Sequence, residues 1–185
     1  MNNYKKTYMP GFLVSFVLLM LPVSASGEQQ KKINIGVGTY GLVVVNDSSV
    51  LDDDQLSGYT MSGQYAFSDM FALRAAWYAL DHRDFTNIDA QGFDLVAYIG
   101  GGLISTGFKI YGGGGYYSET WETPGNSESF KGLQLSGGLG YNWQNAGLDF
   151  VLALRQTSDY EDVLATTGTA IDAAASATLI VSARF

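Results

Sequence analysis

The chain has 185 residues, with 18 acidic residues, 10 Lys or Arg residues, no cysteine and a formal net charge of −8. This acidic balance argues against nucleic acid as a partner, because phosphate binding requires clustered basic side chains. The lack of cysteine excludes disulfides, thiolate metal sites and cysteine nucleophiles. A mean hydropathy of +0.05 excludes a bundle of transmembrane helices. The length suits a single closed β domain.

Residues 1–25 have the pattern of a secretory signal peptide. Lys5 and Lys6 precede an apolar core, Phe12–Leu21, which is too short to cross a bilayer as a helix. Val23-Ser24-Ala25 then supplies the small residues that a signal peptidase requires. We therefore predict that residues 26–185 form an exported mature domain.

Eight segments of the mature domain alternate apolar and polar residues and are separated by turn signals. Each is near or above the roughly 9–11 residues that a tilted strand needs to cross a bilayer. The predicted strands are Lys32–Val45, Leu56–Phe67, Met70–Leu80, Ala90–Gly101, Gly107–Ser118, Phe130–Asn142, Gly147–Gln156 and Ala174–Phe185.

The connections between these strands alternate strictly between two lengths. Three are short: 68–69, 102–106 and 143–146. Four are longer and acidic: 46–55, 81–89, 119–129 and 157–173. This alternation predicts an all-β fold, an eight-stranded antiparallel up-and-down transmembrane β-barrel, with short periplasmic turns and long external loops.

Alternation alone does not decide which face of the strands points outward, because a lipocalin-like soluble barrel would turn its apolar face inward. The aromatic residues favour an apolar outer face, since they gather at the strand ends as two interfacial bands do. The band expected near the short turns comprises Phe67, Phe71, Phe108, Tyr141, Trp143 and Phe185, and the band toward the long loops comprises Tyr59, Trp77, Phe93, Tyr116 and Trp121.

The opposite, polar faces of the strands carry full charges and should point into the lumen. An eight-stranded barrel leaves room for packed side chains and little else, so the lumen should be filled. The side chains expected to form ion pairs there are Arg74, Asp94, Lys109, Asp149, Arg155 and Arg184. Asp149 and Arg184 lie near the same ends of neighbouring predicted strands, and we predict that they pair.

The last strand carries an apolar face that ends on an aromatic residue, with Leu179, Val181, Ala183 and Phe185 in alternate positions. With the strand count, the loop asymmetry and the aromatic bands, this ending makes the chain resemble the small eight-stranded Gram-negative outer-membrane barrels of the OmpA/OmpX type. The resemblance implies a cell outer-membrane location among outer-membrane lipids and lipopolysaccharide. It also implies that these four residues are the signal read by the barrel-assembly machinery.

No motif indicates a cofactor, a metal centre or a catalytic site. The G-x-G-x-x-G match at Gly36–Gly41 lies inside a predicted strand, whereas a dinucleotide site requires a helix to follow. His82, the only histidine, adjoins Asp81 and Asp84, so the alternative to a non-enzymatic barrel is a lipid A-modifying enzyme with His82 as general base. A narrow pore or carrier is the third hypothesis.

The leading hypothesis is a non-enzymatic, monomeric outer-membrane barrel with a structural role or a role in surface interaction. Its long loops and their edges hold most of the acids of the chain, so an extracellular ligand should meet an acidic surface. A solvated acidic surface without a ligand is the simpler interpretation. The acids are Asp47, Asp52, Asp53, Asp54, Asp81, Asp84, Asp89, Glu119, Glu122, Glu128, Asp159, Glu161, Asp162 and Asp172.

Overall fold

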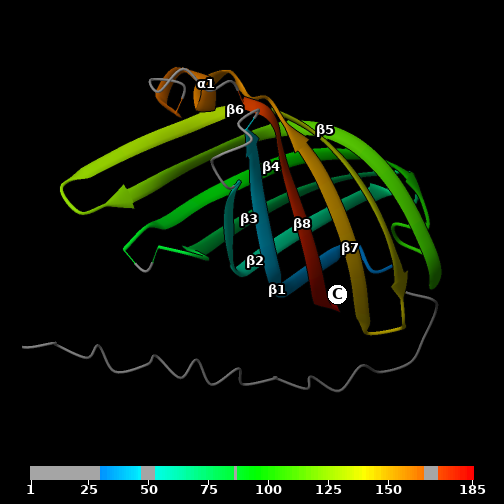
Figure 1. Ribbon diagram of the computed structural model, residues 1–185. Helices are drawn as coiled ribbons and strands as arrows, with labels where there is room; N and C mark the ends of the chain where they lie inside the picture. Colours follow the sequence, from blue (N-terminus) through cyan, green and yellow to red (C-terminus); the bar gives the residue numbers. More distant parts are fainter. Residues whose placement is uncertain (1–29, 47–52, 86, 165–170) are drawn as a thin grey trace, which may run out of the picture.

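The computed structural model describes residues 30–46, 53–85, 87–164 and 171–185. These residues form a closed barrel in which each strand pairs with its neighbours in the sequence, and β1 pairs with β8 to complete the ring (Figure 1). All eight pairings are antiparallel, so the predicted up-and-down β-barrel is confirmed. The predicted signal peptide, residues 1–25, lies outside the described residues.

Each predicted strand corresponds to one observed strand. Their bounds are β1 Ile33–Asn46, β2 Asp54–Ser68, β3 Phe71–His82, β4 Asp89–Gly101, β5 Gly107–Thr123, β6 Asn126–Asn142, β7 Ala146–Arg155 and β8 Ile171–Arg184. One helix, α1 (Ser158–Leu164), lies between β7 and β8. In the part of the chain that the structure describes, no helix is long and apolar enough to span a bilayer.

The barrel closes where the first and last strands meet. Asn34 lies opposite Arg184 in the register of β1 and β8, and the N–H of Ile33 donates to the carbonyl of Phe185 at 3.1 Å. The start of β1 and the end of β8 therefore lie at the same end as the three short turns, which we call the short-turn end. The opposite end is the long-loop end.

The outer face of the barrel is apolar and the inner face is polar, the reverse of a soluble barrel. Phe108, Ile110 and Leu135 are 85%, 72% and 71% exposed, whereas Lys109, Asp149 and Arg155 are almost completely buried. Burial alternates along every strand, as the period of two requires. The predicted outward direction of the apolar face is confirmed, and such a surface requires lipid around it.

Two of the predicted long loops contain regular structure instead. Residues 119–129 continue β5 and β6 as a hairpin that turns at Pro124-Gly125, where Gly125 has a φ of +91° that glycine adopts readily. The yellow-green hairpin projects beyond the neighbouring strands in Figure 1. The predicted loop 157–173 contains α1, which packs mainly against β6. Both segments were predicted as loops because they are rich in charged and small polar residues, which is the usual composition of loops.

Candidate functional site

Charged side chains from alternate strands meet inside the barrel nearer the short-turn end. Asp149 of β7 accepts a hydrogen bond from Lys109 Nζ of β5 at 2.8 Å and another from the Tyr111 hydroxyl at 2.5 Å. Arg74 of β3 lies 3.3 Å from Asp149 and also donates to Gln64 Oε1 at 2.7 Å. We call Arg74, Lys109, Tyr111 and Asp149 the lower network.

A second cluster lies nearer the long-loop end and surrounds Arg155. Its guanidinium contacts Glu119 at 2.6 Å and Asp94 at 3.2 Å, and donates to the hydroxyls of Tyr40 and Tyr78 at 2.6 and 2.9 Å. We call Asp94, Glu119, Arg155, Tyr40 and Tyr78 the upper network. Each charge in it has several hydrogen-bonding partners, which is the condition under which buried ion pairs are tolerated.

The structure brings together five of the six charged residues expected in the lumen. Arg184 also points inward, but no ion pair joins it to Asp149 among the described residues. Arg184 instead donates to the carbonyls of Trp143 and Ile104, which belong to two of the short turns. The physical reason is that these turns bring backbone acceptors within reach of the guanidinium, while Lys109 and Arg74 already occupy the Asp149 carboxylate.

Two residues that the sequence placed on the outside are buried in the lumen. Glu119, expected in an acidic loop, is 2% exposed, and Trp121, expected in the outer aromatic band, is 7% exposed. The Trp121 indole N–H donates to Glu119 at 2.9 Å. Both share the inward parity of Lys109 and Tyr111, so continuing the alternation of β5 past Ser118 would have identified them.

The short-turn end of the lumen is closed by the turn 102–106. Leu103 and Ile104 are buried and pack with Tyr98, Tyr111 and other inward residues. Asn142 Nδ2 donates to the carbonyls of Gly102 and Ser105 at 2.9 and 3.1 Å, which holds this turn against the barrel wall. In the sequence, the signal for this closure is the presence of two apolar residues, Leu103 and Ile104, in a turn of five residues.

Asp69, in the turn between β2 and β3, anchors the same closing turn. Its carboxylate accepts hydrogen bonds from the backbone N–H groups of Gly102, Ile104 and Ser105 at 3.2, 2.9 and 2.8 Å. Partial burial opposes ionisation, but these N–H groups outweigh it and hold the pKa of Asp69 below its ordinary value.

The long-loop end is closed by aromatic residues from α1 and the β5–β6 hairpin. Tyr160 of α1 is fully buried, stacks on Phe130 with ring centroids 4.7 Å apart, and donates to Glu119 at 2.6 Å. Trp121 packs edge-on against Phe130 at 5.2 Å. The helix is therefore attached to the barrel by a side chain that belongs to the lumenal core.

His82 does not have a nitrogen free to act as a base. Its Nδ1 accepts from the backbone N–H groups of Asp84 and Phe85 at 3.1 and 3.3 Å, and its Nε2 lies 3.2 Å from Asp54 Oδ1. With these partners, the His82 ring connects the start of β2 to the loop after β3. No serine or threonine hydroxyl bonds to His82 among the described contacts.

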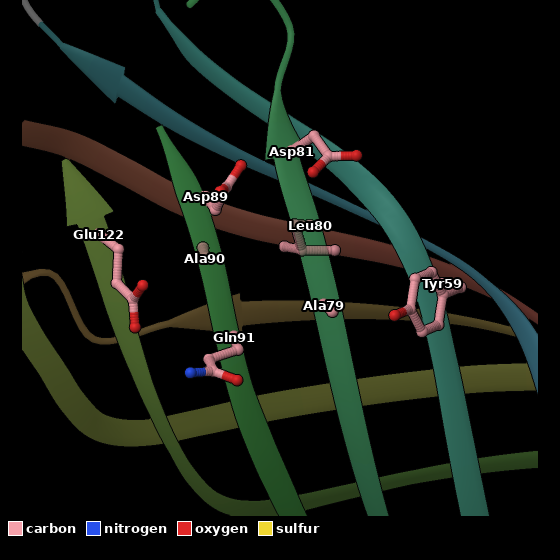
Figure 2. A pocket seen from close by; sticks show the side chains of 8 residues that line it. All are labelled: Tyr59, Ala79, Leu80, Asp81, Asp89, Ala90, Gln91 and Glu122. Atoms are coloured by element: carbon pink, nitrogen blue, oxygen red, sulfur yellow. The ribbon is translucent and has the colours of Figure 1, made fainter. Parts of the chain in front are cut away.

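Three acidic side chains form a row on the outer face at the long-loop end. Asp81 of β3 lies opposite Asp89 of β4, which lies opposite Glu122 of β5. The row borders a hollow of about 270 Å³ beside Tyr59 and Gln91 (Figure 2). None of the three acids forms an ion pair within the described residues, and no described group of three or more acidic, histidine or cysteine side chains is placed to hold a metal ion.

The residues that resemble an assembly signal lie on the outer face of β8. Leu179, Val181 and Phe185 are 47%, 58% and 60% exposed, and Ala183 is half-buried between them. The rest of the predicted aromatic bands also faces outward, apart from Trp121, which lies in the lumen. Phe67, Phe71, Phe108 and Trp143 are exposed at the short-turn end, and Tyr59, Trp77, Phe93 and Tyr116 at the other.

Comparison with known proteins finds likeness in solved structures alone. No protein-family model and no curated protein matches the sequence. The Ail protein of Yersinia pestis superposes with a TM-score of 0.56 and 18% identity, over 85% of this chain and 100% of that one. Neisserial surface protein A superposes with a TM-score of 0.58 and 11% identity, over 83% of this chain and 97% of that one. The N-terminal barrel of Pseudomonas aeruginosa OprF superposes with a TM-score of 0.51 and 15% identity, over 84% of this chain and 100% of that one.

The closed eight-stranded topology and the apolar outer band together define a small outer-membrane β-barrel of the Gram-negative type. The three solved structures are barrels of this class. At identities of 11–18%, the similarity concerns the fold alone. By the general pattern of such barrels, we expect the short-turn end at the periplasmic side and the long-loop end at the extracellular side.

Proposed function

We propose that this protein is a non-enzymatic outer-membrane barrel that displays a rigid acidic surface outside the cell. The observation that carries the proposal is the closure of the lumen at both ends, by Leu103 and Ile104 below and by Tyr160 above. A barrel filled in this way favours neither the pore nor the carrier hypothesis. The engaged ring of His82 gives the lipid A-modifying hypothesis no support. The assembly signal at Phe185 and export through residues 1–25 belong to the same proposal.

The extracellular surface favours a positively charged partner. Its exposed acids include Asp81, Asp84, Asp89 and Glu122. Exposed cations among the described residues of this end are Arg83 and Lys131. Such a surface attracts basic groups and repels anionic ones over roughly a Debye length, about 8 Å at physiological salt.

A related fold shows a different preference. Ail of Yersinia pestis was crystallised with a heparin analogue, sucrose octasulfate, and that structure superposes on this chain with a TM-score of 0.52 and 17% identity. A polysulfated sugar would meet the acid row of this chain with like charge. We therefore do not expect this chain to bind the same ligand. We do expect it to display an interaction surface on an eight-stranded barrel.

Binding of charged surfaces tests this proposal. Barrels in lipid nanodiscs should bind beads coated with a basic peptide at low salt, lose that binding as salt rises, and ignore heparin-coated beads. The triple variant Asp81→Asn, Asp89→Asn, Glu122→Gln should bind the basic beads less than the wild-type barrel does. The control variant Gln91→Glu should show no such loss of binding. Heparin binding by the wild-type barrel, or steady ion conductance in planar bilayers, would count against the proposal.

A further inference from the structure

The His82 ring holds the turn that follows β3 against the neighbouring strand β2. His82 is the last residue of β3 and is 6% exposed, at the long-loop end of the barrel. Its Nδ1 accepts from the backbone N–H groups of Asp84 and Phe85, at 3.1 and 3.3 Å. Its Nε2 lies 3.2 Å from Oδ1 of Asp54, the first residue of β2. The Phe85 ring packs on the imidazole, with the ring centroids 5.0 Å apart.

The Nδ1 atom can hold the turn only while it carries no proton. A backbone N–H group donates and does not accept, so Nδ1 must offer its lone pair to both N–H groups. The charged imidazole ring carries a proton on each nitrogen. Its Nδ1 is then a donor that faces two donors, and both hydrogen bonds to the turn are lost.

The charges around His82 favour the protonated ring. Asp54 is the acid that forms an ion pair with it among the described residues, and an opposite charge at this distance stabilises the charged form. This contact persists when the turn is released, because it uses the other nitrogen. The remaining charges on β2, β3, β4 and the turn bond to other groups or are exposed: Asp53 to Asn46, Arg83 to Gln55, and the exposed Asp81, Asp84 and Asp89.

We propose that His82 is a pH-sensitive latch, which holds the turn after β3 while its ring is uncharged and releases the turn when the ring is protonated. The held state has no place for a proton on Nδ1 and the released state binds one, so acid favours release. Histidine is the side chain whose charge ordinarily changes between about pH 5 and 8, so mild acid suffices. The turn joins Asp81 to Asp89, so the latch also fixes one side of the acid row. The inference goes beyond the proposed function and does not depend on it.

Amide hydrogen exchange of the folded barrel in lipid nanodiscs, at about pH 7.5 and about pH 5.5, tests this proposal. We expect the amides of Asp84 and Phe85 to lose roughly tenfold of their protection at the lower pH, after correction for the intrinsic exchange rate. The amides of Ile104 and Ser105, which the Asp69 carboxylate holds at the other end of the barrel, are the internal control and should keep their protection. Equal protection of Asp84 and Phe85 at both pH values would overturn the proposal.

The variant His82→Asn distinguishes a latch from a side chain that caps the turn at every pH. Asparagine offers an oxygen acceptor to the backbone N–H two residues on, and it does not titrate. We therefore expect protection in His82→Asn to be equal at both pH values, and an acid-induced loss as large as in the wild type would overturn the proposal. Heat-modifiability on gels establishes that the variant folds.

An NMR titration of the wild-type barrel gives a readout that needs no variant. His82 is the only histidine of the chain, so its ring signals are unambiguous. We expect these signals and the protection of the Asp84 and Phe85 amides to change with the same midpoint. A ring that titrates at a different pH from the loss of protection would overturn the proposal.

Discussion

Glu119 and Arg155 meet in the barrel lumen at 2.6 Å, with both side chains fully buried, although they lie 36 residues apart on β5 and β7. Glu119 also accepts from Tyr78 and Tyr160, and the Arg155 guanidinium lies over the ring of Tyr117 at 4.5 Å. This pair therefore ties the barrel wall to α1. Removing either charge leaves the other desolvated and under-compensated.

Replacement of Glu119 should destabilise the barrel more than any replacement on the acidic surface. Glu119→Leu leaves Arg155 and the Tyr78 and Tyr160 hydroxyls short of an acceptor, and should cost about 3–5 kcal/mol of unfolding free energy. Glu122→Leu, three residues along the same strand and exposed, should change it by less than about 0.5 kcal/mol. Urea unfolding in lipid vesicles measures both. Equal unfolding midpoints would refute the buried assignment of Glu119.

The lower network makes a separate prediction about coupling. Asp149→Leu should lower the unfolding midpoint, because Lys109 and Arg74 lose their shared carboxylate. A double-mutant cycle with Lys109→Met should give a coupling energy of about 0.5–3 kcal/mol. The same cycle with Arg184→Met should give a smaller value, since Arg184 bonds to turn carbonyls. Stronger coupling to Arg184 than to Lys109 would restore the pairing expected from the sequence.

The sequence predicted the barrel well because one physical rule determines it. Side chains alternate along each strand, and this parity correctly directs Asp149, Arg155 and Leu135 to their faces. Loop lengths then establish the up-and-down order. Parity does not specify partners across the lumen, because those join strands that are not neighbours, such as β5 and β7 in the Glu119–Arg155 pair.

The closures at the two ends were harder to predict for a different reason. The turn 102–106 folds inward and α1 inserts Tyr160, and neither follows a period of two. Arg184 bonds to turn carbonyls rather than to Asp149, and the inward fold of the turn 102–106 supplies one of these acceptors. Glu119 was assigned to a loop because acidic residues are depleted in strands, and burial with Arg155 overrides that propensity.

The end of β8 makes a prediction about assembly. Deletion of Phe185 removes an exposed aromatic residue of the periplasmic band and the residue that resembles the assembly signal. We expect the truncated protein to accumulate in the periplasm and be degraded. Phe108→Ala, which removes another exposed aromatic residue from the same end, should still assemble. Cell fractionation with heat-modifiability on gels distinguishes them, and normal outer-membrane levels of the truncated protein would contradict the prediction.

The Asp69 anchor makes the periplasmic closure sensitive to acid. Because its pKa is lowered in the folded state, its stabilisation is present above the unfolded pKa, about 3.9, and is lost as pH falls through the lower folded pKa. We expect the amides of Ile104 and Ser105 to be protected from hydrogen exchange at pH 5 and to lose that protection in strong acid. Asp69→Ala should expose them at both pH values. Protection in this variant equal to wild type would show that Asp69 is not the anchor.

The Tyr160 side chain should decide whether α1 stays on the barrel. Tyr160→Ala removes the ring that stacks on Phe130 and the hydroxyl that bonds to Glu119, so α1 should detach and become open to protease at residues 158–164. Tyr160→Phe keeps the stack and removes one bond to a charged group, worth about 1.5–3 kcal/mol, so cleavage should rise by less. Ser158→Ala, at an exposed position of the same helix, is the control and should cleave like wild type. Limited proteolysis of whole cells measures all three, and resistance of Tyr160→Ala equal to wild type would show that α1 is held by other contacts.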